Sequence, residues 1–392
     1  MERYWIWLAD RKRLSQGEKL ALRQKFSSVQ ALYEATDYGP DIGGAALASL
    51  LDKDLAPAEK ILADCKRRGA GVLTAEDPRY PQRLKEIPDP PVVLYYLGTL
   101  PDFDKEIPIA MVGTRRPTAY GLMSAAKLGG EIAQAGGLVV SGVAYGVDAE
   151  AMWGAVRAGK PVVGVLGCGI DVVYPQANRE LYRATEAQGC LISEYAPGIR
   201  PNQWTFPKRN RIISGLSLAV VVVEAPEKSG TMITAADARR QGRDLFAVPG
   251  HIQDENCAGS NRLLATGAIP VTCGKDVVAR YTKEKKPAQK PLTSTPQKPA
   301  APQKPVAPQK PAPQPPEAPR YAPTTDRNGA VRMDELSQQE QLIVRQLMES
   351  PATVNMLISA TGLTSSQIRV CLTVLEMKKL VRYIPGGRVE LI

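Results

Sequence analysis

The sequence predicts an α/β protein in which a doubly wound, mostly parallel sheet follows an N-terminal helical module and precedes a C-terminal winged-helix domain. Short apolar runs alternate with helical stretches across residues 71–280, and apolar residues recur at helical spacing across residues 1–70. Residues 326–392 contain three helical stretches and a hairpin. The chain has 392 residues, of which 44% are hydrophobic, and this is enough for one sizeable core and smaller modules.

Residues 1–70 are expected to form a small helical module with helix-hairpin character. Ser15 precedes Glu18 by three residues, which is the spacing of a capping box at the start of a helix. Apolar residues continue at helical spacing from Leu20 to Leu32, and a second helix is expected over residues 45–65.

Residues 71–280 are expected to form the core domain. Its apolar runs are typical of buried parallel strands and lie at 109–112, 138–140, 162–166, 190–192, 218–223 and 245–248. Helical stretches separate most of these runs, which indicates a parallel sheet with helices on both faces and right-handed crossovers.

Residues 281–325 are expected to be a disordered linker rich in Pro, Lys and Gln. The tetrapeptide Pro-Gln-Lys-Pro recurs at 296–299, 302–305 and 308–311, and such a segment cannot bury a core. Residues 281–320 hold eight Lys and Arg against two Glu, so most of the net charge of +10 lies here. The global charge is therefore weak evidence about the folded part, and any case for nucleic-acid binding rests on local clusters.

Residues 326–392 are expected to form the winged-helix domain. Helices are predicted over 338–349, 353–360 and 365–379, and a hairpin over 381–391. A helix-turn-helix followed by a hairpin is typical of this fold.

The residue types exclude several kinds of chemistry. The chain has one histidine, His251, and its six cysteines form no C-x-x-C pair, so neither a metal site nor a Ser-His-Asp triad is expected. No apolar run of about 18 residues predicts a membrane helix, and the first residues do not resemble a signal peptide. We therefore expect a cytoplasmic protein with reduced thiols, without catalytic residues and without a cofactor.

The loops that follow the predicted strands are the candidate site, because ligands of doubly wound sheets bind at the carboxyl ends of strands. After residues 109–112, Gly113 allows close backbone approach, and Arg115 and Arg116 supply two permanent cations suited to phosphate. The next helix offers free N–H groups. The loop is not G-x-G-x-x-G, which argues against a dinucleotide, and the alternative to phosphate binding is a structural turn with solvated arginines.

Three further loops, 141–148, 167–179 and 229–231, are rich in glycine or hydroxyl groups. Hydroxyl groups beside a glycine at a helix start, as in Ser229-Gly230-Thr231, form a nest for an anion. The alternatives are an ordinary turn or helix cap in each loop, including a helix cap by Asp148.

A basic run lies between these loops. Lys208, Arg209 and Arg211 adjoin the aromatic residues Trp204 and Phe206. Cations for phosphates beside aromatic faces for bases are what sequence-tolerant binding of single strands requires. The alternative is a solvated basic run.

The sequence resembles the DNA-processing protein A (DprA/Smf) family over residues 77–269. The resemblance rests on motifs that occur in order: DPRYP at 77–81, VGTRR at 112–116, SGVAYGVD at 141–148, YP at 174–175, FPKRNRIISG at 206–215, EA at 224–225, SGT at 229–231 and VPG at 248–250. It implies a Rossmann-like core that binds single-stranded DNA in a basic pocket and forms a homodimer. It also implies loading of the RecA recombinase in natural transformation, by displacing or bypassing single-strand binding protein.

Two positions depart from the family pattern. Met152 stands where the family usually has a histidine, and Gln176 replaces a frequent lysine, with Arg179 nearby as a substitute. From the loops and the resemblance together, the residues expected to contact DNA are Gly113, Thr114, Arg115, Arg116, Ser141, Gly142, Arg179, Lys208, Arg209, Asn210, Arg211, Ser229, Gly230 and Thr231.

Two other functions remain open from the sequence. Ser229-Gly230-Thr231 is reminiscent of a loop of nucleotide phosphoribohydrolases, although residues 232–235 offer no catalytic glutamate. A transcription regulator acting through the winged helix would read bases with Ser365, Ser366, Gln367 and Arg369.

Overall fold

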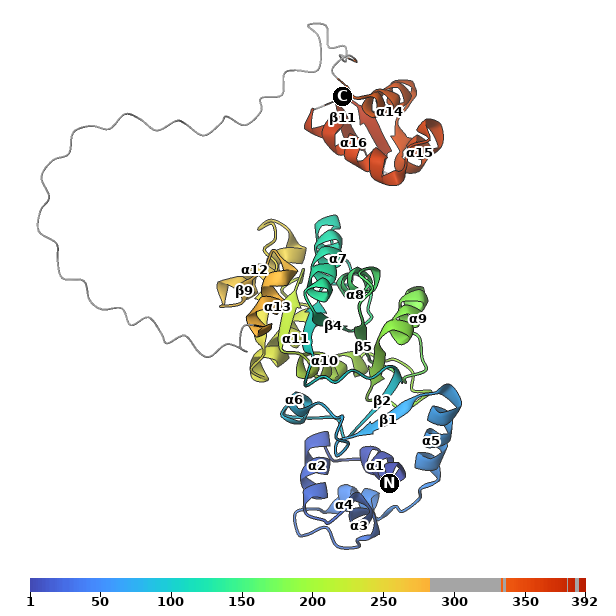
Figure 1. The fold of residues 1–392 in the computed structure, drawn as a ribbon, viewed down its shortest axis with the longest axis vertical. Coiled ribbons are helices and arrows are strands. Elements are labelled where there is room, and N and C mark those ends of the chain that lie inside the picture. Colours follow the sequence, from blue (N-terminus) through green and yellow to red (C-terminus); the bar gives the residue numbers. More distant parts are fainter. Residues whose placement is uncertain (283–332, 334–335, 379, 385–387) are drawn as a thin grey trace, which may run out of the picture. The chain divides into compact units, whose positions relative to one another are not determined.

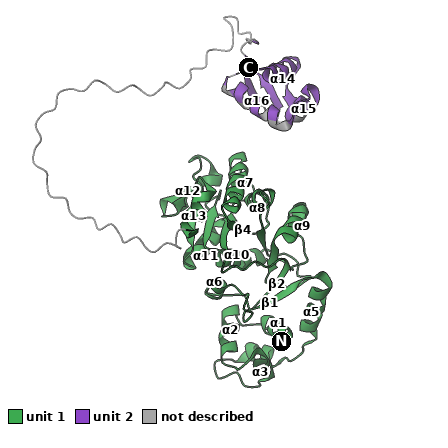
Figure 2. Ribbon diagram, in the orientation of Figure 1, with its two compact units in different colours: residues 1–292 green, residues 293–392 purple. Residues whose placement is uncertain are grey.

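The computed structural model describes residues 1–282, 333, 336–378, 380–384 and 388–392. The chain divides into two compact units, Met1–Leu292 and Thr293–Ile392 (Figure 2). Apart from residues 281 and 282, the predicted linker lies outside the described residues. The α/β fold class, with a mostly parallel sheet, a helical N-terminus and a winged-helix domain, is confirmed (Figure 1).

A nine-stranded sheet forms the centre of the first unit, in the order β1-β2-β6-β5-β4-β3-β7-β8-β9. The strands are β1 (Gly71–Thr74), β2 (Val93–Gly98), β3 (Ile107–Val112), β4 (Gly137–Ser141), β5 (Val162–Leu166), β6 (Cys190–Ser193), β7 (Ala219–Val222), β8 (Asp244–Ala247) and β9 (Ile269–Pro270). All neighbours from β6 to β9 pair in parallel. All six predicted strands are present, because runs of fully buried, mostly β-branched residues have few alternatives to a central strand.

Helices cover both faces of this sheet. The connections that follow β3, β4 and β5 contain α7 (Ala119–Gln134), α8 (Val147–Arg157) and α9 (Arg179–Gln188). The connections that follow β6, β7 and β8 contain α10 (Thr205–Leu216), α11 (Gly230–Arg240) and α12 (Glu255–Ala265). Right-handed crossovers place these two sets on opposite faces, and α13 (Gly274–Thr282) packs against α7.

The N-terminal helices share one continuous core with the sheet. They are α1 (Glu2–Ala9), α2 (Gln16–Gln24), α3 (Val29–Glu34), α4 (Gly44–Leu51) and α5 (Ala56–Arg68); the short α6 (Gln82–Lys85) follows β1. The predicted capping box of Ser15 and Glu18 is present at the start of α2.

The single helix predicted over residues 45–65 was wrong, because the structure has two helices, α4 and α5, with a turn between them. The carboxylate of Asp52 accepts from the backbone N–H of Asp54, and that of Asp54 accepts from the N–H of Ala56. Pro57 then lies in the first turn of α5, where its missing N–H costs nothing. These local hydrogen bonds compete with a continuous helix.

The second unit contains α14 (Gln338–Glu349), α15 (Val354–Thr361) and α16 (Ser365–Met377). A three-stranded sheet of β10 (Ala352–Thr353), β12 (Arg388–Leu391) and β11 (Val381–Ile384), in that order, packs with them. Gly362 ends α15 in the left-handed conformation, at a φ of 70°. Within the described residues, no helix of either unit is long and apolar enough to span a membrane.

Candidate nucleic-acid interface

The direction of the chain reverses beside β3, and this creates a crevice at the carboxyl ends of the strands. From β3 the chain winds through β4 and β5 to β6 on one side, and it then returns to place β7 on the other side of β3. Ligands of doubly wound sheets bind at such a switch point. A pocket of about 740 Å³ lies here, between the loops that follow β3 and β7.

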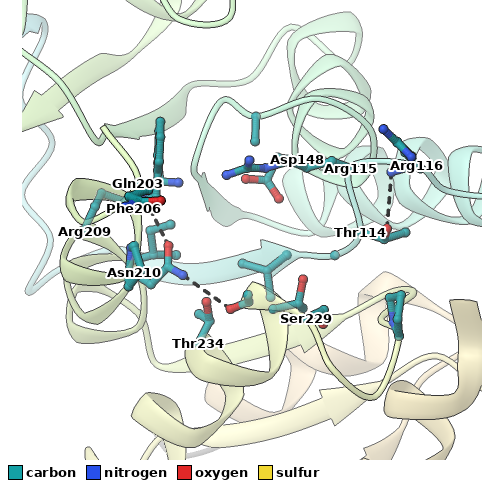
Figure 3. Close-up of a pocket in the computed structure, with 18 of the residues that line it drawn as sticks. Thr114, Arg115, Arg116, Asp148, Gln203, Phe206, Arg209, Asn210, Ser229 and Thr234 are labelled. Atoms are coloured by element: carbon teal, nitrogen blue, oxygen red, sulfur yellow. Dashed lines mark hydrogen bonds between the residues drawn. The ribbon is translucent and has the colours of Figure 1, made fainter. Parts of the chain in front are cut away.

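Six parts of the chain line this pocket, and Figure 3 shows many of their side chains around it. They are the β3–α7 loop, the β4–α8 loop with the start of α8, Tyr174 after β5, the start of α10 with the residues before it, the start of α11, and Asn256 at the start of α12. Residues far apart in the sequence therefore meet because the sheet aligns the ends of its strands.

Arg115 is the central cation of the pocket. Its guanidinium lies over the ring of Phe206, 5.2 Å from the ring centroid, and the ring of Tyr174 lies 5.5 Å from that of Phe206. Neither Arg115 nor Arg116 has an ion-pair partner among the described residues. The pocket thus combines aromatic surface with two cations outside any ion pair of the described residues, and the charge of Arg115 also acts on the Asp148 carboxylate.

Glu224, at the end of β7, fixes the loop that presents these arginines. Its buried carboxylate accepts from the hydroxyl and, at 2.9 Å, from the backbone N–H of Thr118, the N-cap of α7. Its carbonyl accepts from the N–H of Thr114 at 2.7 Å. A Cβ at Gly121 would lie 2.4 Å from the carboxylate, so the helix approaches this closely only with glycine there.

Asp148 and Arg209 form the buried floor of the pocket. Arg209 is 4% exposed and donates to the carbonyls of Gly142 and Val165. The Asp148 carboxylate accepts from the N–H of Gly142 at 3.0 Å. Burial raises the pKa of Asp148, against the opposing effect of the Arg209 guanidinium. Burial likewise lowers the pKa of Arg209, although a guanidinium stays charged in proteins.

The start of α11 forms another wall of the pocket. The Ser229 hydroxyl oxygen is buried and has no hydrogen-bond partner among the described residues, although Ser229 is the N-cap of the helix. Asn210 of α10 donates weakly to the Gly230 carbonyl at 3.5 Å (Figure 3). This wall offers backbone N–H groups and the positive end of a helix dipole to an anion.

Comparison with known proteins identifies the family. The family model described as DNA recombination-mediator protein A matches residues 71–282, which is more than half of the chain. The chain belongs to this family. A second model, described as the DprA winged helix domain, matches residues 307–387. The expectation of a protein that is not an enzyme is confirmed, because this is a family of recombination mediators.

Relatives and solved structures agree with the family. The chain is similar to Protein Smf of Synechocystis (40% identity over 223 residues, 56% of each chain) and to DNA processing protein DprA of Bacillus subtilis (38%; 60% of this chain and 80% of the relative). The match thus spans little more than half of the Synechocystis protein. The X-ray structure of Streptococcus pneumoniae DprA superposes with a TM-score of 0.63 (34% identity; 71% of this chain and 98% of that chain).

A further solved structure bears on the ligand. It describes the single-stranded DNA binding mode of DNA processing protein A from Helicobacter pylori, and it superposes with a TM-score of 0.50. The two chains are 30% identical, and the match covers 55% of this chain and 96% of that chain.

Nine of the fourteen residues expected to contact DNA line the one pocket. They are Gly113, Thr114, Arg115, Arg116, Arg209, Asn210, Ser229, Gly230 and Thr231. These nine come from two of the loops that the sequence singled out and from the basic run, so the crevice gathers segments that are far apart along the chain.

The other five residues do not line this pocket, although Gly142 lines a small adjoining hollow that shares Arg115 and Phe206 with it. Ser141 is buried and donates to the Met111 carbonyl, while the space beside Gly142 holds the Arg209 guanidinium. Arg211 pairs with Glu194 at 2.6 Å, beneath the surface. Arg179 and Lys208 line two other hollows, one beside α9 and one between α10 and α11.

Several residues beside the pocket were missing from the set expected to contact DNA, although the sequence had singled out Phe206 as an aromatic face beside the basic run. Tyr174, Gln203 and Phe206 line the pocket. Arg200 and Lys228 precede the lining residues Pro201 and Ser229; both are exposed, and neither has an ion-pair partner in the described part of the chain. Both residues could have been predicted from the sequence, because each is a cation in or beside a loop that follows a strand. Met152, at the position of the usual family histidine, is fully buried in α8 and does not line the pocket.

Proposed function

We propose that this chain is a recombination mediator that binds single-stranded DNA in the crevice between β3 and β7 and helps load the RecA recombinase onto incoming DNA in natural transformation. One observation carries the proposal. One pocket is lined by Arg115 and Arg116, which form no ion pair within the described residues, by the ring of Phe206 and by the N-terminus of α11.

The chemistry of the pocket favours a single strand over a duplex. Guanidinium groups and helix N–H groups suit phosphates, and the exposed ring of Tyr174, which packs against Phe206, suits the face of a base. In a duplex the bases are already stacked and paired, so only their edges and the backbone are available. The relative from Helicobacter pylori is described as binding single-stranded DNA, and this supports the same ligand here.

Handing the strand to RecA requires a protein that holds DNA without chemically altering it. We propose that it holds incoming DNA in the cytoplasm and displaces or bypasses single-strand binding protein there. We further propose that the chain forms a homodimer through its core, which would present two such pockets to one strand. The family's designation as a recombination mediator supports the role of holding DNA for the recombinase.

A base-releasing enzyme finds little support in the pocket. Asp148 is the one carboxylate that lines it among the described residues, and its oxygen is already held by the Gly142 N–H. Residues 232–235 of α11 carry no acid. A general acid–base pair is therefore missing from the lining.

The alternative of a winged-helix transcription regulator stays a prediction. The side chains of Ser365, Ser366 and Arg369 lie outside the described ones. Deleting residues 326–392 tests it: if duplex binding disappears while single-strand binding stays, the winged helix reads duplex DNA.

The loading role is tested by RecA filament assembly on a strand coated with single-strand binding protein. We expect the full chain to accelerate assembly and Arg115→Ala to abolish the acceleration. The matched control is Arg157→Ala, because Arg157 ends α8 at the far end of the helix from the pocket and is also exposed. No acceleration by the wild-type chain would contradict the loading role, and equal acceleration by Arg115→Ala would contradict the assigned site.

A further inference from the structure

Trp204 is the most exposed aromatic side chain that the structure describes, with 75% of its surface accessible. Among the four tryptophans of the chain, Trp5 and Trp7 are buried and Trp153 is half-buried. Leaving a large indole in water forgoes a considerable hydrophobic stabilisation. Stability of the fold therefore does not explain why it stands at this position.

A rigid turn presents this indole. Asn202 accepts from the backbone N–H of Trp204 at 2.9 Å and from that of Thr205 at 3.1 Å. The Thr205 hydroxyl in turn donates to the Asn202 carbonyl at 2.9 Å, and Trp204 is the N-cap of α10. The backbone under the indole is thus fixed by several hydrogen bonds, so little ordering entropy is lost when a ligand contacts it.

The turn lies at the rim of the DNA pocket. Gln203 and Phe206, on either side of the indole in the sequence, line the pocket, whereas Trp204 itself does not. Arg200 and Lys208 flank the turn in the sequence, and both are exposed cations without an ion-pair partner among the described residues; Lys208 lines the hollow between α10 and α11. An aromatic face between two free cations, directly outside a cationic pocket, matches the composition of a single-strand track.

We propose that Trp204 is a stacking platform for an unpaired base that lies immediately outside the pocket. The inference rests on the proposed function and extends it in two ways. It lengthens the binding site beyond the pocket, and it adds a contact that favours a single strand over a duplex. An indole ring can stack only on the exposed face of a base. A single strand exposes such faces, and a duplex conceals them between neighbouring pairs.

Affinity measurements test the platform. We expect Trp204→Ala to weaken binding of an oligothymidylate roughly tenfold, since the stacking of one base is lost. Trp204→Phe should restore much of the affinity. The salt dependence should stay that of the wild type, because stacking releases no counterions, whereas Arg115→Ala should flatten it. Met123→Ala is the matched control, as Met123 is an exposed apolar residue of α7 that does not line the pocket.

A strand with one abasic site at successive positions locates the stacked base. The wild type should lose affinity at a position that Trp204→Ala no longer distinguishes. Bound strand should also quench tryptophan emission, and Trp204→Phe should remove the quenching. If Trp204→Ala binds every strand as the wild type does, the platform is refuted, while loss of binding in Arg115→Ala would still support the pocket. Loss of partner-protein binding alone would reassign the indole to a protein contact and also overturn the proposal.

Discussion

Replacing Arg209 by alanine should damage the fold more than it damages phosphate binding. The guanidinium is almost fully buried and donates to the carbonyls of Gly142 and Val165, with Asp148 close by. Removing one member of a buried charged cluster typically costs about 3–5 kcal/mol, because the remaining charge and the unpaired carbonyls stay buried. We expect Arg209→Ala to lower the free energy of unfolding by about this amount.

The loss of stability in Arg209→Ala should depend on pH, because Asp148 loses its cationic neighbour. Burial raises the pKa of Asp148 in the folded chain above its unfolded value, and Arg209 opposes that rise. In Arg209→Ala the pKa of Asp148 rises further, so the ionised carboxylate costs stability at high pH, and protonation relieves the cost as the pH falls. The destabilisation relative to the wild type should therefore be smaller at about pH 5 than at about pH 8. Adding Asp148→Asn should recover part of the stability.

Urea denaturation followed by tryptophan emission is the assay. All four tryptophans lie within residues 1–282, so the signal reports on the first unit alone. If Arg209→Ala keeps the wild-type stability but binds DNA more weakly with a flatter salt dependence, Arg209 is a phosphate ligand and the reasoning is refuted.

Two other changes separate supporting residues from binding ones. Arg211→Ala should cost about 3–5 kcal/mol in urea denaturation because it leaves the buried Glu194 without its partner. Lys208 of the same helix is exposed and forms no ion pair within the described part of the chain, so Lys208→Ala should leave stability unchanged. Equal stabilities of Arg211→Ala and Lys208→Ala would refute this distinction. Gly121→Ala should cost about 1–3 kcal/mol, since its methyl group meets the Glu224 carboxylate. Gly230→Ala is the control with open space at its Cβ, and a thermal melt that ranks the two equally would contradict the assignment of Glu224 as the anchor of the loop.

The sequence was sufficient for the centre of the sheet and for the loops that hold the pocket. The edge strands β1 and β9 were missed because they are short. Their neighbour β2 was missed although four buried apolar residues, at 92–95, cover its start, so its signal was present in the sequence. The pocket emerged because a parallel sheet aligns the carboxyl ends of its strands, so motifs far apart in the sequence meet without any specific prediction of contact.

The individual roles within the basic run could not be predicted from the sequence. Lys208, Arg209 and Arg211 were expected to act together, yet they lie on α10, where successive residues are rotated by about 100°. Lys208 therefore faces solvent, Arg209 lies under the pocket and Arg211 pairs with Glu194. Only the packing of α10 decides which cation is left free.

The salt dependence of single-strand binding tests the central claim most directly. In a titration over a range of salt concentrations, we expect the full chain to prefer a single strand to a duplex, and Arg115→Ala to reduce the logarithmic slope by about 0.7 for each phosphate that the variant no longer neutralises. Arg157→Ala should follow the wild type. An Arg115→Ala variant with wild-type affinity and slope would contradict the claim that the crevice between β3 and β7 holds the strand.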